Sequence, residues 1–249
     1  MLSFDQRKPI IDGYITVLDS LVKNDKLEGH IFSHPEMIWK QKNLYQLAQN
    51  SSRILEIGFN AGHSSILLLV ANPLLELYCF DIATHTYIDK CFNFISSQFP
   101  GRIHLIKGDS RVTVPKFAAD NKNLLFDGFH VDGCHSPEVA MQDLDNCYLL
   151  AQKYAWVVFD DTDYSALAKL WEQYLQQRKI KVLDLASNKL FSTVKFLHGI
   201  GRYTLDWEWY LQRYPDLTAA GIKDKAGAYH HWLHHGNKEQ RAPNSSYAQ

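Results

Sequence analysis

The segment that most constrains the fold is residues 53–62, where an apolar run leads into two glycines. Residues 54–57 are apolar apart from Glu56, which is the pattern of a strand covered on both faces. Gly58 and Gly62 then permit a tight turn, or a close approach of the backbone to a ligand. A helix is predicted over residues 63–70, and its free N–H groups would face whatever lies over the turn. The segment therefore predicts either a plain glycine turn or a ligand at the first strand–helix junction of an open α/β sheet.

Composition is that of an ordinary globular protein. The 249 residues are 46% hydrophobic and 21% charged, enough for one large domain with or without an appendage. The net charge of −1 gives no electrostatic drive toward nucleic acid or an anionic membrane. The chain does not open on a signal-like apolar core, and its apolar runs are too short to span a bilayer, so we expect a cytoplasmic protein. Because no two cysteines form a C-x-x-C pair, we expect reduced core thiols at all four positions, Cys79, Cys91, Cys134 and Cys147.

Helix and strand patterns alternate from residue 53 onward. This alternation predicts an α/β fold in which helices cover both faces of a doubly wound, mainly parallel sheet. Strands are predicted at residues 53–57, 75–81, 102–107, 125–132, 156–160, 179–185 and 190–197, with helices at 63–70, 87–99, 113–120, from 136 and at 164–176.

The two ends of the chain have different patterns. Residues 1–50 are predicted to form an N-terminal helical cap, in which His30 and His34 are either surface histidines or substrate contacts. Two glycines near residue 200 mark a predicted boundary, after which no strand pattern follows. We therefore predict a main domain at residues 51–200 and a small all-helical module at residues 203–244.

Two acids follow the second and third predicted strands. Asp81 lies about twenty residues after Gly58, the spacing at which a carboxylate accepts both ribose hydroxyls of an adenosine-containing ligand. Its alternative role is to cap a helix. Asp109 ends the third strand, so strand ends offer glycines and acids at the one sheet edge where open α/β folds bind ligands.

Three more aspartates follow two neighbouring strands. Asp132 ends the fourth strand, and Asp160 and Asp161 end the fifth. Adjacent strands lie about 4.8 Å apart, so these carboxylates should converge. Converging like charges are unfavourable unless a cation neutralises them, and oxygen ligands favour a hard cation such as Mg²⁺, Mn²⁺ or Ca²⁺. The alternative is that one aspartate caps a helix and another binds a loop.

Two motifs together resemble a known enzyme family. Glu-x-Gly-x-x-x-Gly at residues 56–62 resembles motif I of the class I S-adenosylmethionine (SAM) methyltransferases, and it lacks a glycine of the dinucleotide fingerprint. Val-Asp-Gly-x-His-Ser-x-Glu at residues 131–138, followed by a strand that ends in Asp-Asp, resembles the metal-dependent O-methyltransferases of this class, notably the macrolide-sugar group. The resemblance covers residues 35–197 and implies a Rossmann-like seven-stranded sheet whose last strand is antiparallel.

The resemblance also implies cofactors and roles. SAM and a divalent cation, Mg²⁺ or Mn²⁺, are the implied cofactors, with Asp132, Asp160 and Asp161 as metal ligands. Asp132 and His135 are the implied catalytic residues; the metal would lower the pKa of a substrate hydroxyl and His135 would remove its proton. His135 has two alternatives, an ordinary loop histidine or a hydrogen-bond partner of Asp160. The residues implied to bind SAM are Glu56, Gly58, Asn60, Gly62, Ser64, Asp81, Ile82, Asp109, Ser110 and Asp132.

Residues 205–244 resemble a short helical repeat that accompanies glycosyltransferases and other enzymes of surface-glycan pathways. This resemblance favours a sugar or glycan precursor as the hydroxylated acceptor, and a homo-oligomer or protein partner bound through residues 203–244. Two alternatives remain at this point. One is a hydroxylase-like enzyme with the SAM fold, and the other is a non-catalytic SAM-fold scaffold that is recruited through its C-terminal module.

Overall fold

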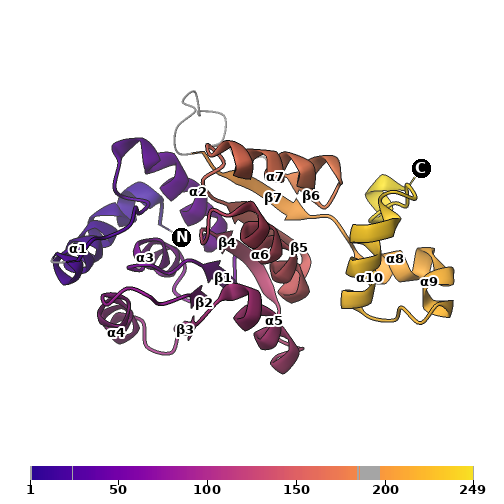
Figure 1. Ribbon diagram of the computed structural model, residues 1–249. Helices are drawn as coiled ribbons and strands as arrows, with labels where there is room; N and C mark the ends of the chain where they lie inside the picture. Colours follow the sequence, from indigo (N-terminus) through magenta and orange to yellow (C-terminus); the bar gives the residue numbers. More distant parts are fainter. Residues whose placement is uncertain (1, 24, 184, 186–196, 249) are drawn as a thin grey trace.

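A seven-stranded sheet forms the centre of the computed structural model, which describes residues 2–23, 25–183, 185 and 197–248. The strand order is β3-β2-β1-β4-β5-β7-β6 (Figure 1). Strands β1 to β5 pair in parallel, whereas β7 runs antiparallel to both of its neighbours. The strands are β1 (Arg53–Ile57), β2 (Glu76–Asp81), β3 (Ile103–Lys107), β4 (Phe126–Val131), β5 (Ala151–Phe159), β6 (Ile180–Val182) and β7 (Gly199–Tyr203).

Helices cover both faces of this sheet. Helices α1 to α4 pack on one face, and α5 to α7 pack on the other together with the C-terminal helices. None of the described helices has the length and apolar character needed to cross a bilayer. The helices are α1 (Phe4–Val22), α2 (Ile38–Gln49), α3 (His63–Ala71), α4 (Ile88–Gln98), α5 (Ser110–Asp120), α6 (Pro137–Leu150), α7 (Ser165–Gln176), α8 (Trp207–Arg213), α9 (Pro215–Ala219) and α10 (Lys225–His231), with short helical turns at Pro35–Met37, Trp232–Gly236 and Ser245–Tyr247.

Strand β1 shows why its sequence is apolar on both faces. Ile54 packs into the core under α1 to α4, while Leu55 and Ile57 pack into the core on the opposite face. Because successive side chains of a strand point to opposite faces, only a strand that lies between two helical layers needs both sets to be apolar. The predicted doubly wound, mainly parallel sheet is therefore confirmed.

The last strand lies later in the chain than the sequence pattern predicted. Residues 190–196 of the predicted strand lie outside the described residues, and β7 instead spans the glycines that we expected to mark a boundary. A Cβ atom on Gly199 would lie 2.3 Å from the ring of Trp171, and one on Gly201 would lie 2.2 Å from the side chain of Ile180. These glycines are needed because helix α7 and strand β6 pack directly against the backbone of β7.

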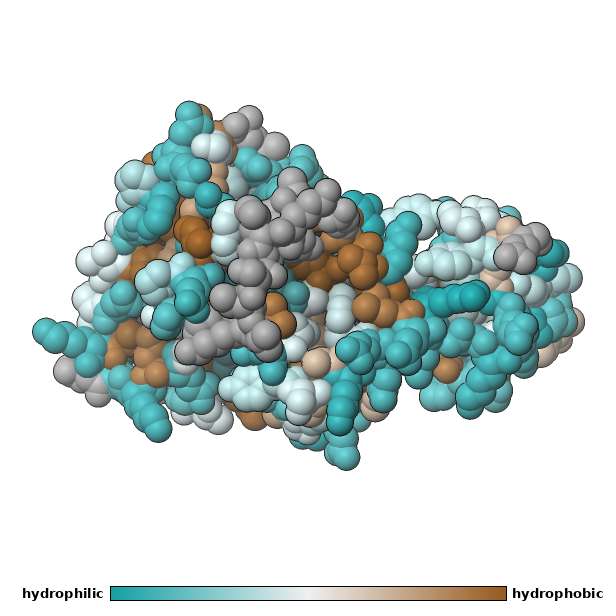
Figure 2. Space-filling model, turned by 90° about the horizontal axis from the view of Figure 1, so that it is seen from above, coloured by the Kyte–Doolittle hydropathy of each residue, from teal (hydrophilic) through white to brown (hydrophobic). Residues whose placement is uncertain are grey.

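The C-terminal residues are helical, as predicted, and they share a core with the sheet domain. The ring of Tyr229 stacks on Tyr148 of α6 with centroids 3.7 Å apart, and its hydroxyl donates to Asp145 at 3.0 Å. Trp232 is fully buried in the same hydrophobic cluster as the strand residue Phe129. Figure 2 shows this module projecting from one side of the main body with a mainly hydrophilic visible surface. Aromatic packing on α6 therefore fixes the module to the sheet domain.

Gly58 offers a direct test of how the turn after β1 is built. It has φ of +95°, and a Cβ atom there would lie 1.9 Å from the backbone oxygen of Asp132. We expect Gly58→Ala to lower the free energy of unfolding by about 2–4 kcal/mol, measured by urea denaturation. Gly13→Ala is the matched control, because Gly13 lies within α1 with open space around it; this change should raise stability by about 0.5–1 kcal/mol. Equal stabilities for Gly58→Ala and the unaltered protein would contradict this account.

Candidate functional site

A cavity of about 700 Å³ opens at the carboxyl edge of the sheet. Residues that follow β1 to β5 form its floor, and the segment before α2 contributes a second wall through residues 28–31. The carboxyl ends of parallel strands meet at one edge, so residues far apart in the sequence reach the same space. The predicted site residues that line the cavity are Gly58, Asn60, Asp81, Ile82, Asp109, Ser110, Asp132, His135, Asp160 and Asp161.

Three predicted cofactor residues do not line the cavity. The carboxylate of Glu56 is fully buried, accepts a hydrogen bond from Ser64 at 2.6 Å and lies 3.0 Å from His130. A Cβ atom on Gly62 would lie 2.3 Å from the side chain of Ile95. The glycine turn is therefore held from outside the cavity, where β1, α3 and β4 meet, by Glu56, Gly62 and Ser64.

Asp81 lines the cavity and is held in place by hydrogen bonds from the backbone on either side of it in space. Its carboxylate accepts backbone hydrogen bonds from Asn60 at 2.8 Å and from Ala83 at 2.7 Å. The side chain of Asn60 donates to the carbonyl of Gly29 and accepts from the hydroxyl of Tyr87. This network ties the wall at residues 28–31 to the turn after β1. A carboxylate has about four acceptor sites, so Asp81 retains capacity for ligand hydroxyls.

Asp109 has structural partners of its own. It is the N-cap of α5, where it accepts from the backbone N–H of Arg111 at 2.9 Å, and it also accepts from the Arg111 guanidinium. These hydrogen bonds hold the pKa of Asp109 below its ordinary value. Asp109 thus forms part of the cavity wall as the N-cap of α5, and the guanidinium of Arg111 neutralises its charge.

The three predicted metal ligands all line the cavity, and Asp132 lies at ligand distance from each of the other two. Ligand atoms of Asp132, Asp161 and His135 lie within 4.8 Å of one another, as do those of Asp132, Asp160 and His130. Burial, and then the neighbouring charge of Asp160, raises the pKa of Asp132 to about 7. Asp161 has φ of +53°, an uncommon backbone conformation for a residue other than glycine, and such strain concentrates at functional sites.

Lys40 is a site residue that the sequence analysis missed. Its side chain is only 5% exposed, and its ammonium forms an ion pair with Asp160 and lies 3.9 Å from Asp161. Burial lowers the pKa of Lys40, but the attraction of Asp160, Asp132 and Asp161 outweighs burial and raises it. The helical pattern contained a signal, since Lys40 lies three residues after buried Met37 and four before buried Leu44.

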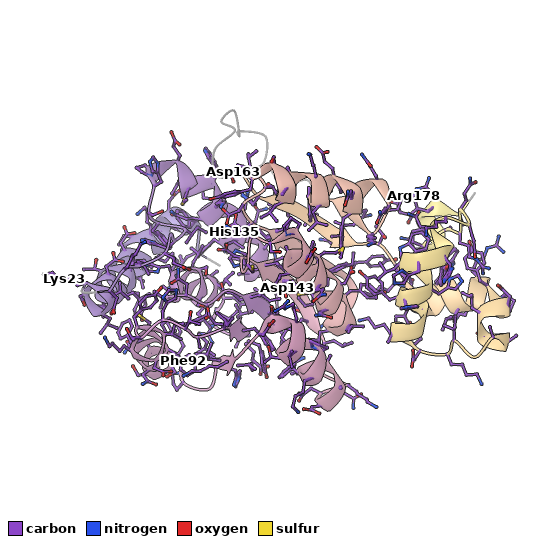
Figure 3. The ribbon with its side chains drawn as sticks, viewed as in Figure 1. Lys23, Phe92, His135, Asp143, Asp163 and Arg178 are labelled. Carbon is purple, nitrogen blue, oxygen red and sulfur yellow. The ribbon has the colours of Figure 1, made fainter. Side chains whose placement is uncertain are left out.

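His135 lines the cavity and is paired with an acid. Its Nε2 atom lies 2.8 Å from an oxygen of Asp161, which raises the pKa of His135 through the hydrogen bond. Of the three interpretations open from the sequence, the structure does not show the hydrogen bond to Asp160, because the partner is Asp161. Figure 3 shows His135 at the carboxyl edge of the sheet with Asp163, which lines the same cavity. An imidazole placed there can accept a proton or bind a metal.

The donor set fits a hard divalent cation. Asp132, Asp160 and Asp161 supply carboxylate oxygens, the ligands that Mg²⁺ and Mn²⁺ prefer. Lys40 contributes one positive charge against these three carboxylates, so it does not neutralise all three when they are ionised. The remaining negative charge favours binding of a further cation.

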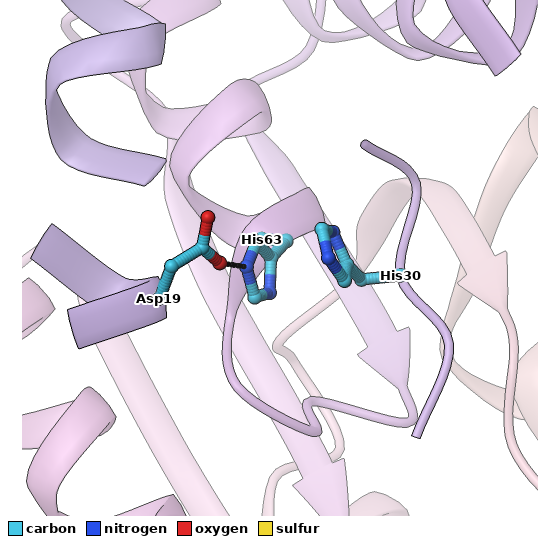
Figure 4. A group of neighbouring side chains, drawn as sticks. All are labelled: Asp19, His30 and His63. Atoms are coloured by element: carbon cyan, nitrogen blue, oxygen red, sulfur yellow. Dashed lines mark hydrogen bonds and ion pairs between the residues drawn. The ribbon is translucent and has the colours of Figure 1, made fainter. Parts of the chain in front are cut away.

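A second histidine cluster lies beside the cavity (Figure 4). His63 of α3 is 2.9 Å from Asp19 of α1, and the ring of His30 stacks on it with centroids 3.8 Å apart. The ligand atoms of Asp19, His30 and His63 lie within 4.8 Å of one another, but the ring lone pairs lie in two stacked planes, which does not favour their convergence on one metal ion. His30 lines the cavity, whereas His34 is exposed and is absent from the cavity lining.

One cysteine differs from the prediction. Cys79, Cys91 and Cys147 are buried thiols, as expected, but Cys134 is exposed and lines the cavity. It lies in the loop between Asp132 and His135, and this loop borders the cavity. The prediction of four core thiols was therefore wrong for Cys134.

Comparison with known proteins agrees with this geometry. Residues 55–162 match the family model described as a methyltransferase domain, a range that runs from within β1 to just past β5 and includes Asp81, Asp132, Asp160 and Asp161. A search of curated proteins finds no match. A putative caffeoyl-CoA O-methyltransferase from Staphylococcus aureus is 14% identical with a TM-score of 0.57, covering 80% of this chain and 99% of that one.

Two further structures are similar. An O-methyltransferase from Bacillus cereus in complex with SAH is 14% identical with a TM-score of 0.55, covering 78% of this chain and 89% of that one. CalS11, a TDP-rhamnose 3'-O-methyltransferase of calicheamicin biosynthesis, is 18% identical with a TM-score of 0.55, covering 81% and 96%. The chain therefore has the fold of these O-methyltransferase structures, and its residues 55–162 are similar to a methyltransferase domain.

His30 predicts a pH dependence of stability. Burial, and then the proximity of His63, lowers its pKa from 6.5 to about 4. The unfolded state therefore binds more protons between these values, and the free energy of unfolding should fall as the pH falls from about 6.5 toward 4. His30→Phe keeps a ring for stacking without a titrating group, so it should weaken this dependence in urea unfolding at pH 7 and pH 5. His34→Phe serves as the exposed control, and an unchanged dependence in His30→Phe would contradict the assignment.

Proposed function

We propose that this chain is a metal-dependent O-methyltransferase that transfers a methyl group from SAM to a hydroxyl of a small molecule. The observation that carries the proposal is that one cavity is lined by two chemically different groups of residues. Gly58 and Asp81 have the character of a nucleoside site, and Asp132 and Asp161 lie at ligand distance from His135. A methyl donor and a hydroxyl held by these two groups would meet in the same space.

In this proposal each residue of the site has a separate role. Asp81 accepts hydrogen bonds from the ribose hydroxyls, while Gly58 lets the backbone approach the donor closely. His135 takes the proton of the acceptor hydroxyl on one ring nitrogen, and Asp161 orients the ring and stabilises the resulting imidazolium. A divalent cation bound among the three acids would lower the pKa of that hydroxyl. Holding both reactants in position contributes much of the acceleration, up to about 7–11 kcal/mol.

The acceptor we favour is a sugar or glycan precursor. The C-terminal residues 205–244 resemble a repeat that accompanies glycan-pathway enzymes, and the structurally similar CalS11 acts on TDP-rhamnose. Polar groups on the cavity wall, including Ser33, Thr84 and Asp163, suit a molecule with several hydroxyls. These observations together support a sugar acceptor.

A thermal melt tests the donor and the metal separately. A ligand at a hundred times its Kd adds about 2.7 kcal/mol to stability, which at this size raises the Tm by roughly 5–10 °C. We expect SAM to raise the Tm, and Mg²⁺ or Mn²⁺ to raise it further in a manner that a chelator reverses. No shift with millimolar SAM would overturn the methyltransferase proposal and favour a non-catalytic scaffold.

Substitution of Asp132 separates a catalytic role from a structural one. Asp132→Asn should abolish the metal-dependent Tm shift and lower methyl transfer to a sugar acceptor at least a hundredfold, because it removes a carboxylate ligand from the cluster. His135→Ala should lower transfer by 10²–10⁴-fold with the SAM shift intact. Asp120→Asn, at an exposed aspartate on α5, is the control for loss of one charge. Full activity in Asp132→Asn would sink the proposed metal site.

A further inference from the structure

The position of Lys40 in the acid cluster carries an inference that rests on the proposed metal site. Lys40 extends from α2, in the N-terminal part of the chain, and its ammonium is buried against Asp160 with 5% of the side chain exposed. Asp160 is itself 7% exposed. A lysine that is buried this deeply requires a charged partner, since an isolated buried ammonium is strongly disfavoured.

The ion pair occupies a carboxylate that a metal would also use. The Oδ1 atom of Asp160 lies against the Lys40 ammonium and also accepts the backbone N–H of Asp161 at 2.9 Å. The same Asp160 carboxylate is grouped with Asp132 at ligand distance. A divalent cation coordinated by all three acids would therefore lie within a few ångströms of the Lys40 ammonium, and like charges at such a distance repel strongly.

We propose that Lys40 is an internal counter-ion that competes with the divalent cation for Asp160. In the metal-free protein it neutralises Asp160 and holds α2 against the strand ends after β4 and β5. Metal binding then requires Asp160 to exchange an ammonium for the ion, or the ion to be held by Asp132 and Asp161 without Asp160. In either case Lys40 weakens metal binding and stabilises the protein without metal.

The test is direct binding of Mn²⁺ to purified full-length variants, by electron paramagnetic resonance of free Mn²⁺, without SAM or acceptor. Lys40→Met keeps an unbranched side chain that is one atom shorter and removes its charge. We expect Lys40→Met to bind Mn²⁺ at least tenfold more tightly than the unaltered protein. Its Tm in chelator should be several degrees lower, and saturating Mn²⁺ should restore it. Lys42→Met, on the same helix but paired with the exposed Asp5, should change neither quantity by a comparable amount.

The outcomes separate this inference from the proposed function. If the unaltered protein binds Mn²⁺ and a folded Lys40→Met protein binds it equally or more weakly, the role of Lys40 is overturned and the metal-dependent mechanism stands. If neither protein binds Mn²⁺, both are overturned. Binding by Lys40→Met but not by the unaltered protein supports the role of Lys40 and removes metal from the proposed mechanism. If Lys40→Met fails to fold in chelator, Lys40→Gln is tested in the same way. Failure of both variants to fold at saturating Mn²⁺ overturns the inference, since the metal would then be unable to replace Lys40.

Discussion

The crowding of carboxylates at one edge of the sheet is the constraint on which the site depends. The parallel strands β4 and β5 place Asp132 beside Asp160 and Asp161. These carboxylates therefore repel one another, although Asp132 lies far from the other two in the sequence. The structure compensates with positive charge from a distant element, the buried Lys40 of α2. The N-terminal segment is therefore part of the electrostatics of the site as well as a cover over it.

Local pattern was sufficient to predict most of the sheet. Strands such as β1 and β4 are buried on both faces, so their composition is dictated by the layers around them and is visible in a short window. Strand β7 was missed because its two glycines have the local pattern of a linker. Gly199 makes room for the ring of Trp171 from α7, and Gly201 makes room for the side chain of Ile180 from β6. A glycine that makes room for a distant side chain cannot be distinguished from a flexible one by its neighbours in the sequence.

The site residues that were predicted have a signal in the nearby sequence, whereas the one that was missed depends on a contact with a distant element. Asp81, Asp132 and Asp160 follow apolar strands, and position at a strand end is enough to place them at the ligand-binding edge. Lys40 owes its role to a contact between elements 120 residues apart, counted from Lys40 to Asp160. Glu56 shows the converse case. The motif placed it at the cofactor, whereas the fold uses its carboxylate to join α3 and β4 beneath the turn.

Helix α6 begins near the acid cluster and contacts the C-terminal module farther along its length. It begins at Pro137, two residues after His135, and the contacts of the module lie toward its other end, at Asp145 and Tyr148. A 14-residue helix spans about 20 Å at 1.5 Å per residue, so the module packs at a distance from the acid cluster. None of its residues lines the cavity described above. The module therefore packs on the part of α6 that lies away from the acid cluster and contributes no wall to the cavity.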